Sequence, residues 1–164
     1  MFEWLKTRNP RRRQGADLYR RMVVLARAPR FYAELGVPDT VEGRFEMISL
    51  HVTLLLRRLH GVDRALADAV LSAMWIDLDA AIRELGIGDL SVAKKMKLLA
   101  SNFYGRAAAY DAALKNADDA ELQSTLVRNV YDGEAPAPAA VAALAAYARD
   151  IAASPELDID RRAA

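Results

Sequence analysis

The chain has 164 residues, 53% of them hydrophobic and 27% charged, a length that allows one domain to bury a core without metal ions or disulfides. It contains no cysteine, which excludes disulfide bonds, thiol catalysis and cysteine-based metal sites. The longest alanine-rich run, 139–148, is about half as long as a membrane-spanning helix, and 1–13 lacks the apolar region of a secretory signal, so we expect a soluble, cytoplasmic protein.

The net charge of +1 conceals an uneven distribution along the chain. Residues 1–30 contain nine lysines or arginines and two acids, and therefore carry +7. Residues 31–164 contain 14 basic and 20 acidic residues, and therefore carry −6. A basic start joined to a mildly acidic body indicates that the first residues meet an anionic partner, such as RNA or phospholipid headgroups.

Residues 1–13 are predicted to form a basic arm with an aromatic tip. Phe2 and Trp4 stand just ahead of Arg11, Arg12 and Arg13. Aromatic side chains beside a basic cluster are typical of a segment that inserts into a membrane interface and attracts anionic headgroups. Two alternatives remain open: the first residues pack on the body while the arginines are solvated, or the arginines contact RNA.

Two helices are expected in the first third of the chain. One covers 17–28 and is ended by Pro29, since the residue before a proline disfavours helix. The other covers 39–60, with Asp39 as its N-cap and Gly61 as a left-handed C-cap. Its apolar positions recur at helical spacing: Val41, Phe45, Ile48, Val52, Leu55, Leu56 and Leu59. Because so apolar a helix must be surrounded by others, we expect it at the centre of the fold.

The rest of the chain predicts four more helical segments. One starts at an Asp63 cap and runs to about Leu85, where glycines form a tight connection. The next starts at Ser91, a shorter one follows Asp118, and an alanine-rich one follows Pro138. No segment alternates as a strand does. We therefore predict an all-α, single-domain bundle of about six or seven helices, with a helical domain over 14–153 and a tail over 154–164.

Three stretches of the chain, taken in order, form a recognisable series of motifs. The first is Gly36-Val37-Pro38-Asp39-Thr40 with Gly43-Arg44-Phe45, Leu50-His51 and Arg57-Arg58-Leu59. The second is Asp77-Leu78-Asp79 with Arg83-Glu84-Leu85-Gly86-Ile87-Gly88-Asp89, and the third is Lys94-Lys95-Met96-Lys97 with Phe103-Tyr104-Gly105-Arg106 and Tyr110. Over about residues 31–114 this series resembles the ubiquinol–cytochrome c chaperone family, whose members assist assembly of the ubiquinol–cytochrome c reductase complex in mitochondria and alphaproteobacteria.

The resemblance implies a chaperone that binds newly made cytochrome b and helps it enter the complex. It also implies work at the cytoplasmic face of the inner membrane, with the basic arm near the membrane or the ribosome. Mitochondrial relatives act with a small partner subunit, and the composition fits a bacterial, alphaproteobacterial member. The alternative function is a membrane-surface or RNA-binding module that acts through the arm and uses the body as a scaffold.

Signals of catalysis, metal binding or cofactor binding are weak in this sequence. The two histidines, His51 and His60, lack the spacing of a helical zinc pair, and Glu46 precedes His51 by five residues, whereas a helical di-iron pair needs three. No nucleophile elbow or phosphate loop is present. We therefore expect no enzyme, no metal and no cofactor, and we expect His51 to be a hydrogen-bonded core residue.

The charged residues that follow the central helix allow two interpretations. In the first, Asp79 and Arg83, which are four residues apart on one helix face, form a solvated ion pair. Alternatively, Asp79 and Asp89 form, with Asp77, an acidic rim opposite a basic cluster that includes Lys94 and Lys97. The family resemblance favours a partner-facing surface here.

Two further places are candidates for partner contact. Arg44 lies near a helix N-terminus, where the dipole disfavours a cation, so we expect it to brace the Asp39 turn or to meet an acid on a neighbouring helix. A mid-helix glycine, Gly105, costs about 1 kcal/mol relative to alanine, so it needs a packing or contact reason. Close helix approach is one reason; a client groove is the other, with these neighbours as candidate contacts: Phe103, Tyr104, Arg106 and Tyr110.

Overall fold

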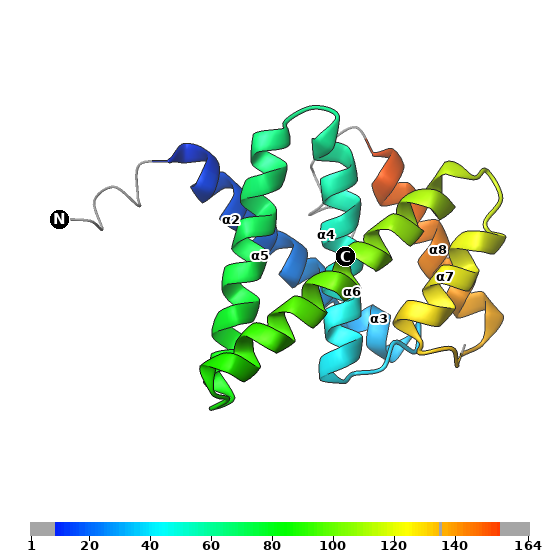
Figure 1. Cartoon of the computed structure of the whole chain (residues 1–164). Coiled ribbons are helices and arrows are strands. Elements are labelled where there is room, and N and C mark those ends of the chain that lie inside the picture. Colours follow the sequence, from blue (N-terminus) through cyan, green and yellow to red (C-terminus); the bar gives the residue numbers. More distant parts are fainter. Residues whose placement is uncertain (1–8, 135, 155–164) are drawn as a thin grey trace.

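The computed structural model describes residues 9–134 and 136–154, and within these residues the chain forms seven α-helices and no strand (Figure 1). The all-α, single-domain bundle expected from the sequence is therefore confirmed. The arm residues Phe2 and Trp4 and the tail from Pro155 onward lie outside the described residues. The helices are α2 Pro10–Ala26, α3 Pro29–Ala33, α4 Val41–His60, α5 Arg64–Glu84, α6 Asp89–Lys115, α7 Ala120–Val130 and α8 Pro138–Ala153.

The central helix of the bundle is α4, as the sequence predicts. Twelve of its 20 residues are buried, and it packs against α2, α5, α6, α7 and α8. Leu50, Leu54 and Leu55 have 1% or less of their surface exposed. A helix that is apolar on most of its faces loses contact with water only when other helices cover each face. The position of α4 therefore follows directly from its composition.

Both ends of α4 differ from the expectation. Its N-cap is Thr40, not Asp39, because the Thr40 hydroxyl accepts from the Gly43 amide at 3.0 Å while the Asp39 side chain is bound by Arg44. Val41 is the first helical residue and faces solvent, so it is not part of the apolar stripe. Gly61 has φ −83°, a right-handed conformation, and the predicted left-handed cap is wrong.

The first helix starts earlier than predicted, at Pro10 instead of Asp17. Asn9 caps it by accepting from the Arg11 amide at 3.1 Å, and Pro10 suits the first turn. The three arginines 11–13 are therefore helical and belong to the body, and Arg11 is paired with Asp63 at 2.6 Å. Further along α2, Gly15 lies so close to α5 that a Cβ would stand 2.6 Å from Ala69.

The connection between α5 and α6 is tight, and the two helices leave it in a V (Figure 1). Gly86 takes φ +73°, as the glycine-rich turn predicts. Helix α6 begins at Asp89, not at Ser91, because the extended Gly88 already serves as its cap. Within α6, a Cβ on Gly105 would meet no atom within 4 Å, so close helix approach does not explain this glycine.

The last two helices complete the core as predicted. The three apolar positions of α7, Leu122, Leu126 and Val130, are buried, and the turn after it has positive φ at Asp132 and Gly133. The stripe expected for α8 is also buried: Val141, Leu144, Ala148 and Ile151. Among the described residues, no helix is both long enough and apolar enough to cross a membrane.

Candidate functional site

Large apolar side chains reach solvent mainly on α5, on α6 and at the turn between them. Ile76 is 61% exposed, and four more of this region are exposed: Leu85, Leu90, Leu98 and Tyr104. A groove of about 420 Å³ runs between the two helices. It is lined by Trp75, Ile76, Asp79, Arg83, Val92, Ala93 and Met96. A contiguous exposed apolar surface with a polar rim is typical of an interaction site.

An aromatic cluster supports one wall of this groove. The Trp75 ring lies 5.6 Å from the Phe103 ring at a perpendicular angle, and 6.1 Å from the Tyr104 ring. Tyr104 is about half exposed and can contact a partner. Phe103 and Tyr110, which were expected to line a groove, are fully buried, because their positions on α6 face the helices inside the bundle. Phe103 packs beneath the groove residue Trp75, whereas Tyr110 lies in the core near Glu46 and Asn129.

The charged residues at the α5–α6 corner form a closed set of ion pairs. The Arg83 Nε atom lies 2.6 Å from Asp79 Oδ2, and Arg83 Nη1 lies 2.7 Å from Asp89 Oδ1. The expected helical pair is therefore present, and the same arginine also binds the start of α6. These carboxylates raise the pKa of Arg83 through their hydrogen bonds. Two of the three acids of the predicted rim are thus bound by one arginine, which leaves Asp79, Arg83 and Asp89 with a net charge of −1.

The third member of that rim, Asp77, faces a different helix. It accepts a hydrogen bond from the Tyr19 hydroxyl of α2 at 2.8 Å. Burial, helped by this carboxylate, raises the pKa of Tyr19 well above its ordinary value. Lys94 and Lys97 are exposed on α6 and form no ion pair within the described residues. The lysines of the expected basic cluster therefore do not contact the acids of the expected rim.

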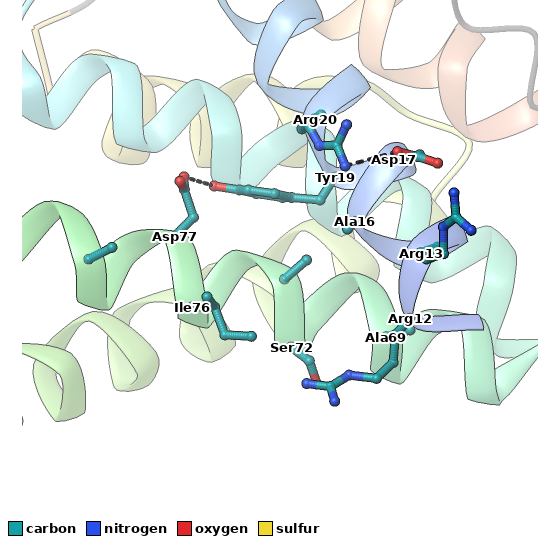
Figure 2. A pocket seen from close by; sticks show the side chains of 12 residues that line it. Arg12, Arg13, Ala16, Asp17, Tyr19, Arg20, Ala69, Ser72, Ile76 and Asp77 are labelled. Carbon is teal, nitrogen blue, oxygen red and sulfur yellow. Dashed lines mark hydrogen bonds and ion pairs between the residues drawn. The ribbon is translucent and has the colours of Figure 1, made fainter. Parts of the chain in front are cut away.

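A second groove, of about 710 Å³, lies on the other side of α5, against α2 (Figure 2). Figure 2 shows the Arg12 side chain extending toward Ser72, while Arg20 is paired with Asp17 at 3.0 Å. The floor consists largely of small residues, Ala16, Ala69, Ser72, Ala73 and Ala80. Ile76 lines this groove as well as the first one. The two grooves therefore lie on the two sides of Ile76.

Two other candidate pairs have structural roles away from this face. Arg44 Nε binds Asp39 Oδ1 at 2.7 Å, which lowers the pKa of Asp39, so Arg44 braces the turn before α4 as predicted. Arg106 of α6 binds Glu46 of α4 at 2.5 Å, and Glu46 is only 6% exposed. Burial nevertheless raises the pKa of Glu46. Arg106, expected at a partner surface, therefore serves first as the partner of an interior carboxylate.

His51 is a core residue, as the sequence indicates. It is 1% exposed, and its Nδ1 atom donates to the Met47 carbonyl at 2.7 Å. Nε2 must then accept, and it does so from the Tyr147 hydroxyl of α8 at 2.7 Å. Burial lowers the pKa of His51 to about 4 because the charged ring would lose its hydration. No group of three metal-ligating side chains is found in the described part of the chain.

The sequence analysis missed the groove residues Trp75, Ile76 and Met96 as a set. One signal was available. The buried positions of α5 include Leu66, Val70 and Met74, and Ile76 lies off that stripe. An apolar β-branched side chain on the polar face of a helix indicates a contact surface when neighbouring helices leave it open.

Comparisons with known proteins agree on one family. A family model described as ubiquinol-cytochrome C chaperone matches residues 33–154. Ubiquinol-cytochrome-c reductase complex assembly factor 1 of Xenopus laevis is 26% identical over 122 residues, covering 73% of this chain and 60% of the relative. The Mus musculus assembly factor 1 is 27% identical over 122 residues, covering 73% of this chain and 41% of the relative.

A solved structure covers nearly the whole chain. The crystal structure of the Cbp3 homolog from Brucella abortus has a TM-score of 0.77 and 38% sequence identity, covering 99% of this chain and 94% of that chain. The chain spans 40% to 60% of the length of the curated relatives that it matches.

Proposed function

The chain belongs to the ubiquinol-cytochrome C chaperone family, and from that premise we propose that it binds newly synthesised cytochrome b and promotes its entry into the ubiquinol–cytochrome c reductase complex. The observation that carries the proposal is the open apolar groove between α5 and α6. A chaperone for a membrane protein must cover apolar side chains that would otherwise aggregate in water. This groove could bind such side chains on a scaffold that is already folded.

The geometry suits recognition of one face of a helix. Trp75, Ile76 and Met96 offer apolar contacts, and the Arg83 ion pairs form a polar rim. An amphipathic or apolar helix laid in such a groove would bury every third or fourth side chain against it. Because about 420 Å³ holds only a few side chains, the client would be held by a short segment and could be released when its partner subunits arrive.

We infer that the protein acts by binding and not by catalysis. Two interior ionisable side chains are engaged within the bundle: His51 is bonded to Tyr147 and Met47, and Glu46 to Arg106. None of these lines the groove between α5 and α6. A site built on apolar contacts, with its rim carboxylate Asp79 held by Arg83, is suited to supply affinity and not general acid–base catalysis.

The test compares two substitutions that each place a carboxylate on an exposed apolar position. Ile76→Asp puts the charge in the groove, whereas Val62→Asp puts it in the exposed turn between α4 and α5. Each tagged variant is used to recover proteins from solubilised membranes of its own cell, and cytochrome b is quantified by mass spectrometry. We expect Ile76→Asp to lose most of the recovered cytochrome b and Val62→Asp to retain it.

A variant lacking residues 1–13 loses the arm together with the first turn of α2 and the Arg11–Asp63 ion pair, so its helix content is checked by circular dichroism before recovery is compared. Cytochrome b recovered without the arm supports client binding by the helical body. If recovery of ribosomes or lipid depends wholly on the arm and cytochrome b is never enriched, the chaperone proposal fails.

A second candidate function is attachment to an anionic membrane surface or to RNA through the first residues and α2. The observation that favours it is the arginine-lined groove between α2 and α5, where Arg12 and Arg13 form no ion pair within the described residues (Figure 2). Arginine binds phosphate oxygens bidentately. Flotation with vesicles containing phosphatidylglycerol, and RNA binding measured across salt concentrations, would distinguish lipid from RNA; binding to neither would exclude this function.

A further inference from the structure

Two leucines at the turn between α5 and α6 lie almost wholly in water. Leu85, which caps the end of α5, is 71% exposed, and Leu90, in the first turn of α6, is 91% exposed. Figure 1 shows this turn at the outer edge of the molecule, where α5 and α6 meet. Neither leucine lines the groove between α5 and α6 or the groove between α2 and α5. Neither the core of the bundle nor the client groove therefore explains them.

Unpaired lysines stand beside the second leucine on the outer face of α6. Lys94 and Lys97 are exposed, and helical spacing places them on the same face as Leu90 and the exposed Leu98. Neither lysine forms an ion pair within the described residues. We call Leu85, Leu90, Lys94 and Lys97 the leucine–lysine patch. It combines apolar side chains that have no cover with cations that have no anion.

The acidic side chains near the turn lie toward the client groove and not on the leucine–lysine patch. Arg83 binds Asp79 and Asp89, and the first two of these residues line the groove. Glu84, at the end of α5, is the other acid of the turn. No aspartate or glutamate occurs within residues 90–110. The outer face of this part of α6 is therefore positive, on a body that is acidic overall, and it complements an anionic surface.

The shape of the turn favours a lipid surface over a protein partner. Side chains that project from a convex turn leave no hollow for a partner to fill, whereas the core of a protein interface needs close complementary packing. The headgroup region of a bilayer accommodates projecting side chains of any shape, and burial of apolar side chains there is favourable. A lysine beside them keeps its apolar stem among the lipids while its ammonium group reaches the phosphates.

We propose that the leucine–lysine patch docks the protein on an anionic phospholipid surface, with Leu85 and Leu90 in the headgroup region and Lys94 and Lys97 on the phosphates. The client groove begins beside the patch, because Val92, two residues beyond Leu90, lines it. Docking would therefore hold the open groove at the membrane surface. The proposal does not depend on the identity of the client, and it uses other residues than attachment through the arm and α2.

The first experiment is flotation of the full-length chain with vesicles of phosphatidylcholine and phosphatidylglycerol in equal parts, and with vesicles of phosphatidylcholine alone. We expect binding to the anionic vesicles that weakens as salt is raised. Leu85→Ser combined with Leu90→Ser should weaken binding about tenfold, because the buried apolar area is lost. Lys94→Gln combined with Lys97→Gln should weaken it about 25-fold, since each lysine near an anionic surface strengthens binding roughly fivefold.

Matched variants elsewhere on the molecule control for charge and for apolar exposure. Arg12→Gln combined with Arg13→Gln removes the same charge from the groove between α2 and α5, and flotation should change by less than about threefold. Val62→Ser removes a side chain that is 88% exposed in the turn between α4 and α5, and flotation should not change. All the replaced side chains are exposed, and circular dichroism checks that each variant stays folded.

A second experiment asks whether Leu90 itself enters the lipid. The chain contains no cysteine, so a single introduced thiol can carry an environment-sensitive fluorophore. Leu90→Cys and Val62→Cys, each labelled with nitrobenzoxadiazole, are compared on the same anionic vesicles. Emission from the Leu90 position should move to shorter wavelength and be quenched by brominated lipids, whereas emission from the Val62 position should stay as it is in water.

Three results would overturn the proposal. Absence of flotation with anionic vesicles would show that no lipid is bound. Flotation lost in Arg12→Gln with Arg13→Gln, but kept when the leucine–lysine patch is changed, would assign lipid binding to α2 and the arm. Dimerisation in light scattering that Leu85→Ser with Leu90→Ser suppresses, without vesicle binding, would assign the patch to a second copy of this chain. Recovery of cytochrome b from solubilised membranes involves no bilayer, so Ile76→Asp tests the client groove separately.

Discussion

Helices α4 and α6 are the two regions whose comparison explains this molecule. Both are long and rich in apolar residues, but α4 buries 12 of 20 residues whereas α6 buries four of 27. On α4 even polar side chains are inside, among them His51 and Thr53. On α6 large apolar side chains such as Leu98 and Tyr104 are outside. The number of apolar residues in a helix therefore does not decide its burial; the number of helices that cover it does.

This difference in burial suggests that the two helices have different roles, α4 in stability and α6 in binding. Helix α4 has neighbours on every side, so its apolar surface stabilises the fold. Helix α6 leaves its connection to α5 at an angle (Figure 1), and part of its apolar surface stays exposed to solvent. Substitutions in α4 should then change the free energy of unfolding, and substitutions on the outer faces of α5 and α6 should change recognition.

The largest effect on the free energy of unfolding is expected when a buried leucine of α4 is replaced by alanine. Leu54→Ala removes a side chain with no exposed surface and should lower the free energy of unfolding by about 4 kcal/mol. Leu98→Ala removes the same atoms from an exposed position of α6 and should change it by less than about 0.5 kcal/mol. Urea denaturation followed by far-UV circular dichroism measures both. Equal losses would contradict the division between the two helices.

A pH effect of about 3 kcal/mol should come from the interior of α4. The folded pKa of His51 is about 4, below the ordinary value of 6.5, so the unfolded chain binds the proton first. Stability is complete above about pH 6.5 and is lost as pH falls from there to about 4. Urea midpoints across this range, compared with those of His51→Gln, should show the loss only in the native sequence.

Two carboxyl groups contribute to the pH dependence of stability in other ways than His51. The pKa of Glu46 is raised by burial, so acidification favours the folded state at this residue. The pKa of Asp111 is lowered, mainly by its hydrogen bond from Lys115, and its contribution is lost only at lower pH. Because His51→Gln leaves both carboxyls in place, the difference between the two curves isolates the histidine. An identical slope in the variant would contradict this assignment.

A smaller pair of effects, opposite in sign, is expected for two glycines. Gly15→Ala places a Cβ 2.6 Å from Ala69 and should destabilise by about 2 kcal/mol, because α2 must move away from α5. Gly105→Ala meets no atom and should stabilise by about 1 kcal/mol through helix propensity. Thermal unfolding of the two variants gives the signs directly. Destabilisation by Gly105→Ala would mean that α6 needs the glycine for its own structure.

The fold was predictable to the extent that local rules determine it. The apolar pattern of α4 predicts its central place, and Asp63 caps α5 as expected, accepting from the Leu66 amide at 3.0 Å. Helix starts were predicted less well, because several polar residues compete for each cap. Thr40 caps α4 since Arg44 occupies Asp39. Such competition depends on side chains that only the folded chain brings together.

The candidate surface was predictable only in part. The charged corner of Asp79, Arg83 and Asp89 is brought together as a unit, and Tyr104 is exposed farther along α6, against Trp75. Phe103 was placed on the wrong side of the surface, because spacing along one helix does not say which face another helix covers. Ile76 was missed for the same reason. Burial is a property of the assembled bundle, and sequence periodicity reports it only for helices that are covered on one side.

The smallest effect on stability is expected at the corner, where Arg83 joins Asp79 of α5 to Asp89 of α6. All three side chains are largely exposed to water, so Arg83→Gln should leave the melting temperature unchanged. Arg83 also lines the groove between α5 and α6, so the variant should recover less cytochrome b. Lys97→Gln removes an equal charge from α6 outside that groove, and it should recover the native amount. Equal losses in both variants would show that net charge matters and the groove does not, whereas a loss confined to Arg83→Gln would support client binding at the charged end of the groove.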